Sequence, residues 1–151
     1  MLLRAAMQPW SSRNALECGM QTFRYMPGIH KTLSRPFDSV LAKLPEALKS
    51  EGFGVLTEID VRSTLRDKLA VEFRPYKIIG ACNPALAHRA LQAELAIGVM
   101  LPCNIAVYED SDQTVVVAVD PMETIAEKSD VLRPIAQEVR GKLERVLERL
   151  S

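Results

Sequence analysis

The sequence lacks an excess of charge of either sign, and this absence argues against one large class of partners. Its 151 residues carry 19 Lys and Arg against 19 Asp and Glu. A protein that binds nucleic acid needs a concentrated basic surface that neutralises phosphates. No run of Lys and Arg supplies such a surface, so we expect no nucleic-acid partner.

Cysteines and long apolar runs are also scarce. The three cysteines, Cys18, Cys82 and Cys103, form an odd and widely spaced set. This set argues against a secreted disulfide framework and favours a reducing, cytoplasmic location. It also lacks the short spacing of zinc ligands, so we expect no metal and no cofactor. No apolar stretch approaches the roughly 20 residues that a membrane-spanning helix needs, and we therefore expect no membrane partner.

Catalytic motifs are missing as well. The chain contains no Gly-x-Ser-x-Gly elbow, no glycine-rich nucleotide loop and no phosphate-binding lysine signature. Glu58 and Asp60 lie two residues apart on an expected strand, where paired carboxylates could share a proton. However, Asp60 is better explained as a helix cap, and Glu58 as a solvated strand residue. The sequence therefore favours a protein that is not an enzyme.

What is present is the composition of a folded domain. Hydrophobic residues make up 48% and charged residues 25% of the chain, which is ordinary for a globular protein. Residues 1–25 carry three Arg against one acid and show no periodicity, so we expect a poorly ordered N-terminal extension. We expect residues 26–151 to form a single α+β domain, because a chain of this length buries enough surface to fold without disulfides.

Residue patterns predict elements in the order β-α-β-α-β-α-β-β-α-α. The expected strands cover residues 28–33, 53–60, 76–82, 97–109 and 114–120. Apolar residues at steps of three and four along 132–150 predict a long C-terminal amphipathic helix. Because helices alternate with the early strands and a hairpin follows, we expect a single mixed five-stranded β-sheet covered by helices. The expected helix caps are Ser34, Asp60, Asn83, Asp120 and Asp130.

Three stretches of the chain resemble, in the same order, motifs of the bacterial family called domain of unknown function 302. They cover residues 52–60, 76–84 and 101–104, which read GFGVLTEID, YKIIGACNP and LPCN. The resemblance runs from Ile29 to the C-terminus, and the extension before it departs from the family pattern. It implies a fold of the TATA-binding-protein-like architectures in small proteins that often self-associate. It implies no activity.

Two of these stretches end or interrupt a strand at the same dipeptide, Cys-Asn. Cys82 and Asn83 precede a helix start, while Cys103 and Asn104 follow Pro102, which cannot donate to a β ladder. If the two strands are neighbours and their faces agree, the two sulfurs could approach each other, and free backbone groups could meet a ligand. These four residues are the candidate ligand-binding site. A structural role for both cysteines is the alternative, because free cysteine is usually a buried small hydrophobe.

Two functions are compatible with these patterns. The first is a non-enzymatic binding or interaction module, homodimeric, that takes a small apolar or anionic ligand. The small residues Gly80, Ala81, Gly98 and Ala106 could leave an apolar hollow, and the helix start at Asn83 offers free N–H groups to an anion. The alternative is a thiol-handling protein, a sulfur carrier or redox protein that uses Cys82 and Cys103. That activity would require exposed thiols with a lowered pKa.

Overall fold

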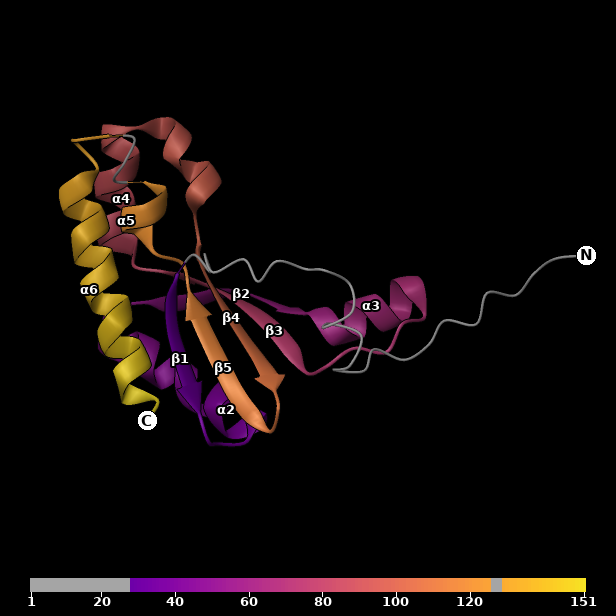
Figure 1. Cartoon of the computed structure of the whole chain (residues 1–151). Helices are drawn as coiled ribbons and strands as arrows, with labels where there is room; N and C mark the ends of the chain where they lie inside the picture. Colours follow the sequence, from indigo (N-terminus) through magenta and orange to yellow (C-terminus); the bar gives the residue numbers. More distant parts are fainter. Residues whose placement is uncertain (1–27, 126–128) are drawn as a thin grey trace, which may run out of the picture.

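The computed structural model describes residues 28–125 and 129–151, and the expected extension at 1–25 lies outside them. Five strands form one sheet: β1 (Ile29–Leu33), β2 (Gly54–Asp60), β3 (Tyr76–Cys82), β4 (Cys103–Asp110) and β5 (Gln113–Ala118). The helices are α2 (Phe37–Ser50), α3 (Val61–Leu69), α4 (Pro84–Ala93), α5 (Pro121–Thr124) and α6 (Arg133–Arg149), with a 3-10 helix η1 at Leu95–Met100. Figure 1 shows their arrangement.

The sheet is antiparallel throughout, with strand order β1-β5-β4-β3-β2. The expected α+β class and the five-stranded sheet are confirmed, and the expected mixed sheet is wrong. A parallel pair requires a helix that carries the chain back to the end where the first strand began. Here α3, between β2 and β3, lies beyond the end of the sheet, as do α4 and η1 between β3 and β4 (Figure 1). Each connection therefore returns the chain at the same end of the sheet, which gives antiparallel neighbours. The likeness to TATA-binding-protein-like architectures stays a prediction.

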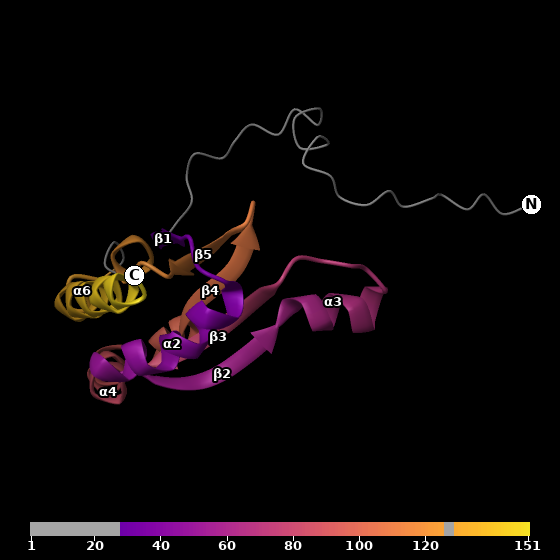
Figure 2. The ribbon, with the colours of Figure 1, turned by 90° about the horizontal axis from the view of Figure 1, so that it is seen from below.

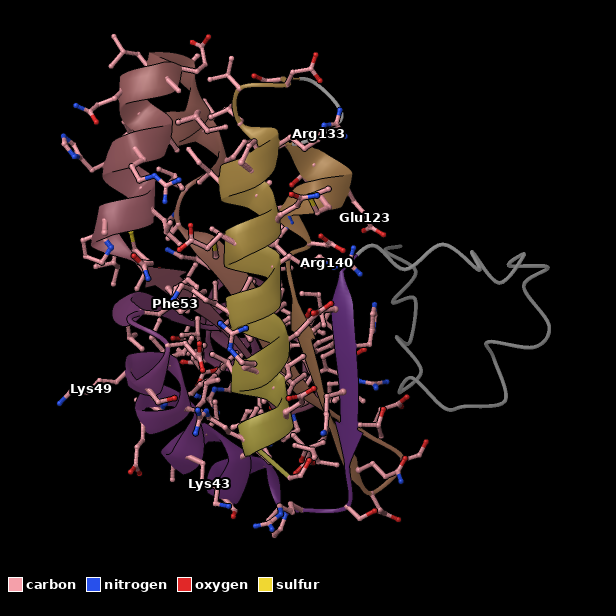
Figure 3. The ribbon with its side chains drawn as sticks, turned by 90° about the vertical axis from the view of Figure 1, so that its left-hand side faces the viewer. Lys43, Lys49, Phe53, Glu123, Arg133 and Arg140 are labelled. Carbon is pink, nitrogen blue, oxygen red and sulfur yellow. The ribbon has the colours of Figure 1, made fainter. Side chains whose placement is uncertain are left out.

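The hydrophobic core lies between one face of the sheet and the helices α2 and α6 (Figures 2 and 3). Val107 on β4 and Val116 on β5 are fully buried in it, as are Leu48 on α2 and Leu143 on α6. Each such side chain contributes about 1.5–3 kcal/mol through the apolar surface that it removes from water. The amphipathic C-terminal helix is thus present as expected, with its apolar stripe turned to the sheet.

Polar side chains start three of the helices as expected. Asp60, Asn83 and Asp120 each accept a hydrogen bond from a backbone N–H two or three residues later, which satisfies one of the unpaired donors of a first helical turn. Ser34 and Asp130 do not cap helices. Both α2 and α6 begin three residues after these positions, without a side-chain cap.

The expected strand over residues 97–109 is wrong in its first half. Strand β4 begins only at Cys103, and the preceding residues form η1, where the Glu94 side chain accepts a hydrogen bond from the N–H of Ala96. A short apolar run is compatible with both a strand and a helix, and Val99 in this run is 87% exposed. Pro102, which follows a cis peptide bond, separates η1 from the ladder.

One ion-pair cluster joins the sheet layer to the C-terminal helix. The Glu51 carboxylate is buried, and it contacts the guanidinium groups of Arg145 at 2.9 Å and Arg149 at 3.4 Å. Glu51 lies between α2 and β2, so the pairs connect this junction to the last turns of α6. Among the described residues, no helix has both the length and the apolar character needed to cross a membrane.

Candidate functional site

The two Cys-Asn corners meet at one end of the sheet, because β3 and β4 are hydrogen-bonded neighbours. The register sets Ala81 opposite Cys103, so the Cys103 side chain lies on the helix-covered face. Cys82 is one residue further along β3, at its end, and the alternation of a strand would turn it to the opposite face. Both cysteines nevertheless line the same cavity.

This cavity is a strongly apolar space that is partly open to solvent. The end of the sheet lines one side, and α4, η1, α5 and α6 surround the rest. The side chains of Phe53, Leu86, Ile97, Ile135 and Val139 are among its large apolar lining groups. Among the described residues that line it, none carries a charge. Such a site suits an uncharged ligand, because a buried ion without a partner is strongly disfavoured.

Asn83 lines the cavity, but its side chain is already engaged. Its Oδ1 accepts a hydrogen bond of 3.2 Å from the N–H of Leu86, and its Nδ2 donates to the carbonyl of Glu51 at 3.4 Å. The side chain therefore fastens the start of α4 to the end of α2. This leaves the α4 N-terminus with less capacity for an anion than the sequence indicated, and favours the apolar ligand over the anionic one.

Asn104 is not brought into the cavity. It lies opposite Gly80 on the other face of the sheet, exposed to solvent, and its backbone carbonyl accepts a hydrogen bond of 2.9 Å from the N–H of Val119. Gly80 does not open a hollow there either. A Cβ atom on Gly80 would lie 2.2 Å from Thr57 Oγ1 and 2.7 Å from Pro102 Cγ, so this glycine permits a close contact.

The thiols lie in surroundings that disfavour their reactive form. Burial raises the pKa of Cys103 to about 11, and the nearby Cys82 thiol adds to this increase. Burial also raises the pKa of Cys82. A thiol with a pKa near 11 is ionised to only about one part in ten thousand at neutral pH, whereas nucleophilic cysteines have lowered pKa values. The geometry brings the two cysteines near each other, but the electrostatics do not activate them.

The helical wall of the cavity was not predictable from residue patterns. Ala87 and Ala90 on α4, and Ala136 on α6, line it and leave room where larger side chains would fill the space. Such small residues on a helix are also typical of close helix packing, so composition alone does not distinguish the two. No cluster of three or more potential metal ligands occurs in residues 28–125 and 129–151.

The sequence model of the domain of unknown function DUF302 matches residues 29–150. The chain belongs to the DUF302 family. A similar solved structure is the crystal structure of an uncharacterized conserved DUF302 protein from Bacillus stearothermophilus. It is 30% identical, with a TM-score of 0.79, and the match covers 84% of this chain and 100% of that one. No curated protein matches the chain. Membership of DUF302 thus confirms the expected resemblance and assigns no activity.

Proposed function

We propose that this DUF302 protein is a non-enzymatic binding module that holds a small, uncharged apolar molecule in the cavity at the end of the sheet. The observation that carries the proposal is the apolar, charge-free lining where Cys82, Asn83 and Cys103 come together. Ligand pockets in proteins usually have mainly hydrophobic walls with a few polar groups. In this reading the two thiols serve as small apolar contacts.

Self-association and a cytoplasmic location belong to the same proposal. The described surface carries several exposed large hydrophobic residues, among them Leu56, Ile59 and Leu69, and extended apolar surface on a protein is typical of interaction sites. The odd number of cysteines suits a reducing compartment. The protein would therefore act as a homodimer in which each subunit carries one cavity.

Thiol chemistry is the second candidate. One observation favours it: Cys82 and Cys103 line the same cavity, and Cys82 is near enough to affect the ionisation of the Cys103 thiol. The raised pKa values of both thiols oppose it. The binding module therefore has the better support.

The cavity can be tested with an uncharged fluorescent probe, N-phenyl-1-naphthylamine. The substitution Ala87→Phe places a ring into the lining, while Ala85→Phe places the same ring on an exposed position of the same helix that does not line the cavity. We expect the wild type and Ala85→Phe to bind the probe, and Ala87→Phe to bind about tenfold more weakly or worse. Circular dichroism should show that both variants fold.

Two results would overturn the ligand proposal. Equal binding by Ala87→Phe and Ala85→Phe would locate the probe elsewhere on the molecule. Absence of probe binding by the wild type, together with native mass spectra of the purified protein that show no retained small molecule, would remove the cavity as a binding site.

A further inference from the structure

One face of the sheet carries apolar side chains that no described helix covers. Successive residues on a strand point to opposite faces, and the register aligns Tyr76 with Tyr108, Ile78 with Ala106, and Ala106 with Val117. All of these side chains are half-buried, whereas Val107 and Val116, on the face covered by α2 and α6, are fully buried. We call the apolar part of this side the open face; it consists of Tyr76, Ile78, Ala106, Tyr108, Val115 and Val117. The polar residues His30, Thr32, Thr57 and Asn104 lie on the same side around it.

The open face is aromatic and uncharged. The rings of Tyr76 and Tyr108 stack with centroids 5.1 Å apart, and Phe73 continues the row at 6.2 Å from Tyr76. Ile59, 48% exposed, lies beside it on β2 opposite Ile78. The nearest ion pair, Arg74 with Asp110 at 3.0 Å, is at the strand ends. A neutral apolar surface fits another neutral apolar surface.

Helix α3 forms an arm beyond the same sheet. None of its residues is buried, and it extends away from α2 and α6 at the end of β2 (Figures 1 and 2). Leu69 on the arm is 65% exposed and Phe73 just after it is 40% exposed. The apolar surface therefore continues from the open face onto the arm. A helix that packs so little on its own chain gains stability when it contacts a second surface.

Charge relates the arm to another part of the same molecule. The arm carries Arg62, Arg66 and Lys68 against the single acid Asp67. The end of β4 and the β4–β5 turn, at the same end of the sheet, carry Glu109, Asp110 and Asp112, of which Asp110 is already paired with Arg74 of its own chain. If two copies stack face to face about a two-fold axis parallel to the strands, the β2 side of each lies over the β1 side of the other. Each basic arm then points toward the acidic turn of the partner.

The open face is smaller than a standard interface. Its three strands, β3, β4 and β5, about 4.8 Å apart and with about five residues at 3.4 Å each, give a face of roughly 14 by 17 Å. A standard interface buries roughly 800 Å² on each partner, so the arm has to contribute. Two sheets stack about 10 Å apart with interleaved side chains, and a two-fold pair is the commonest oligomer of identical chains.

We infer that the open face and the arm form the dimer interface, with the two sheets stacked and the α2–α6 layers outside. This inference rests on the self-association proposed above and names its surface. The rival arrangement pairs the outer edges of two β2 strands, where Leu56 is 64% exposed. In that arrangement the open face would remain in solvent.

Sedimentation equilibrium over a concentration series distinguishes the two arrangements. Val117→Arg places a charge in the open face, while Val99→Arg makes the same change at a residue 87% exposed on η1, outside the face. Leu56→Arg tests the β2 edge. We expect wild type, Val99→Arg and Leu56→Arg to form equally stable dimers. For Val117→Arg we expect a dissociation constant at least about 30-fold higher, the effect of a central interface residue.

A charge swap tests the arm independently and does not alter the sheet. Arg66→Glu should weaken the dimer a few-fold, as should Glu109→Lys, and the double variant should recover most of the loss. Circular dichroism checks the fold of each variant; if Val117→Arg does not fold, Tyr108→Arg replaces it, because Tyr108 lies at a different position of the open face, opposite Val115.

The outcomes separate this inference from the proposed function. A dimer that resists Val117→Arg but is dissociated by Leu56→Arg overturns the open-face interface and leaves self-association intact. A wild type that is monomeric at every concentration overturns both. Neither result bears on the cavity, which the probe experiment tests by itself.

Discussion

Both faces of the sheet carry apolar side chains, but the described helices cover only one of them. Along β4, Val107 is fully buried beneath the helices and the next residue, Tyr108, is half-buried on the open face. Strand β5 repeats the contrast with Val116 and Val117. Both faces carry apolar side chains, yet α2 and α6 remove water from only one. A strand that is apolar on both sides therefore indicates two covering layers, and α2 and α6 supply just one of them.

The largest expected effect comes from truncating matched isoleucines on the two faces. Ile105→Ala empties a fully buried position on the covered face, and we expect it to lower the free energy of unfolding by about 2–5 kcal/mol. Ile78→Ala on the open face should cost about 1 kcal/mol, since this side chain already contacts water. Urea unfolding of both variants at low protein concentration measures the difference.

Protein concentration sharpens this comparison. If the open face is buried in a dimer, the cost of Ile78→Ala should grow as the concentration rises, because dimerisation stabilises the folded state by mass action. The cost of Ile105→Ala should stay constant. Equal costs for the two variants at low concentration would show that the faces do not differ as described.

An intermediate effect on the pH dependence of stability is expected from the ion pairs that connect Glu51 to α6. The hydrogen bond from Arg145 lowers the pKa of Glu51 below 4.5, and the charges of Arg145 and Arg149 act in the same direction against the opposing effect of burial. A carboxylate whose pKa is lower in the folded state stabilises the fold above its unfolded pKa. This contribution is therefore present above about pH 4.5 and is lost as pH falls through the folded value.

Glu51→Gln should remove that pH dependence. We expect wild type to lose more stability than Glu51→Gln between pH 7 and pH 3, as measured by urea unfolding at both values. The matched control is Glu138→Gln, which breaks an exposed ion pair with Arg89 and should leave the pH dependence close to that of wild type. The prediction fails if Glu51→Gln and wild type lose the same amount.

The smallest expected effect is a difference in the alkylation rates of the two cysteines, which report how deeply each thiol is buried at the end of the covered face. In a Cys18→Ser background, the iodoacetamide reaction of Cys103 should be slow at pH 8 and should accelerate with pH up to about 11, where its thiol ionises. Cys82 should react faster, because it is less deeply buried. Rates that level off for both thiols below pH 8.5 would instead favour the thiol-handling function.

The sequence predicted the elements whose signals are local. Asp60 and Asn83 identified the starts of α3 and α4 because a capping side chain bonds to its own first turn. The apolar stripe of α6 identified both the helix and its buried side, with Leu143 and Val146 fully buried. These features depend on residues three or four positions apart, and this is the range over which a sequence pattern is informative.

The strand order and the cavity depend on contacts between distant residues, and the sequence did not specify them. Helices between strands indicated a mixed sheet, whereas α3 projects from the β2–β3 connection. Both Cys82 and Cys103 line the cavity because β3 and β4 are neighbours and both corners are at strand ends, although strand alternation alone would turn the two side chains to opposite faces. The predicted site included Asn104 only because the dipeptide repeats, and the register turns that residue to the other face. Burial raises the pKa of both thiols, and no pattern of neighbouring residues in the sequence indicates how deeply each thiol is buried.

The position of Glu51 links two parts of the molecule that are far apart in sequence. Its backbone carbonyl accepts the hydrogen bond from Asn83 on the cavity wall, and its carboxylate contacts Arg145 and Arg149 on α6. One residue thus joins the lip of the cavity to the helix that covers the sheet. A substitution of Glu51 would therefore remove the ion pairs with α6 while leaving the hydrogen bond from Asn83 available, because every residue carries a backbone carbonyl.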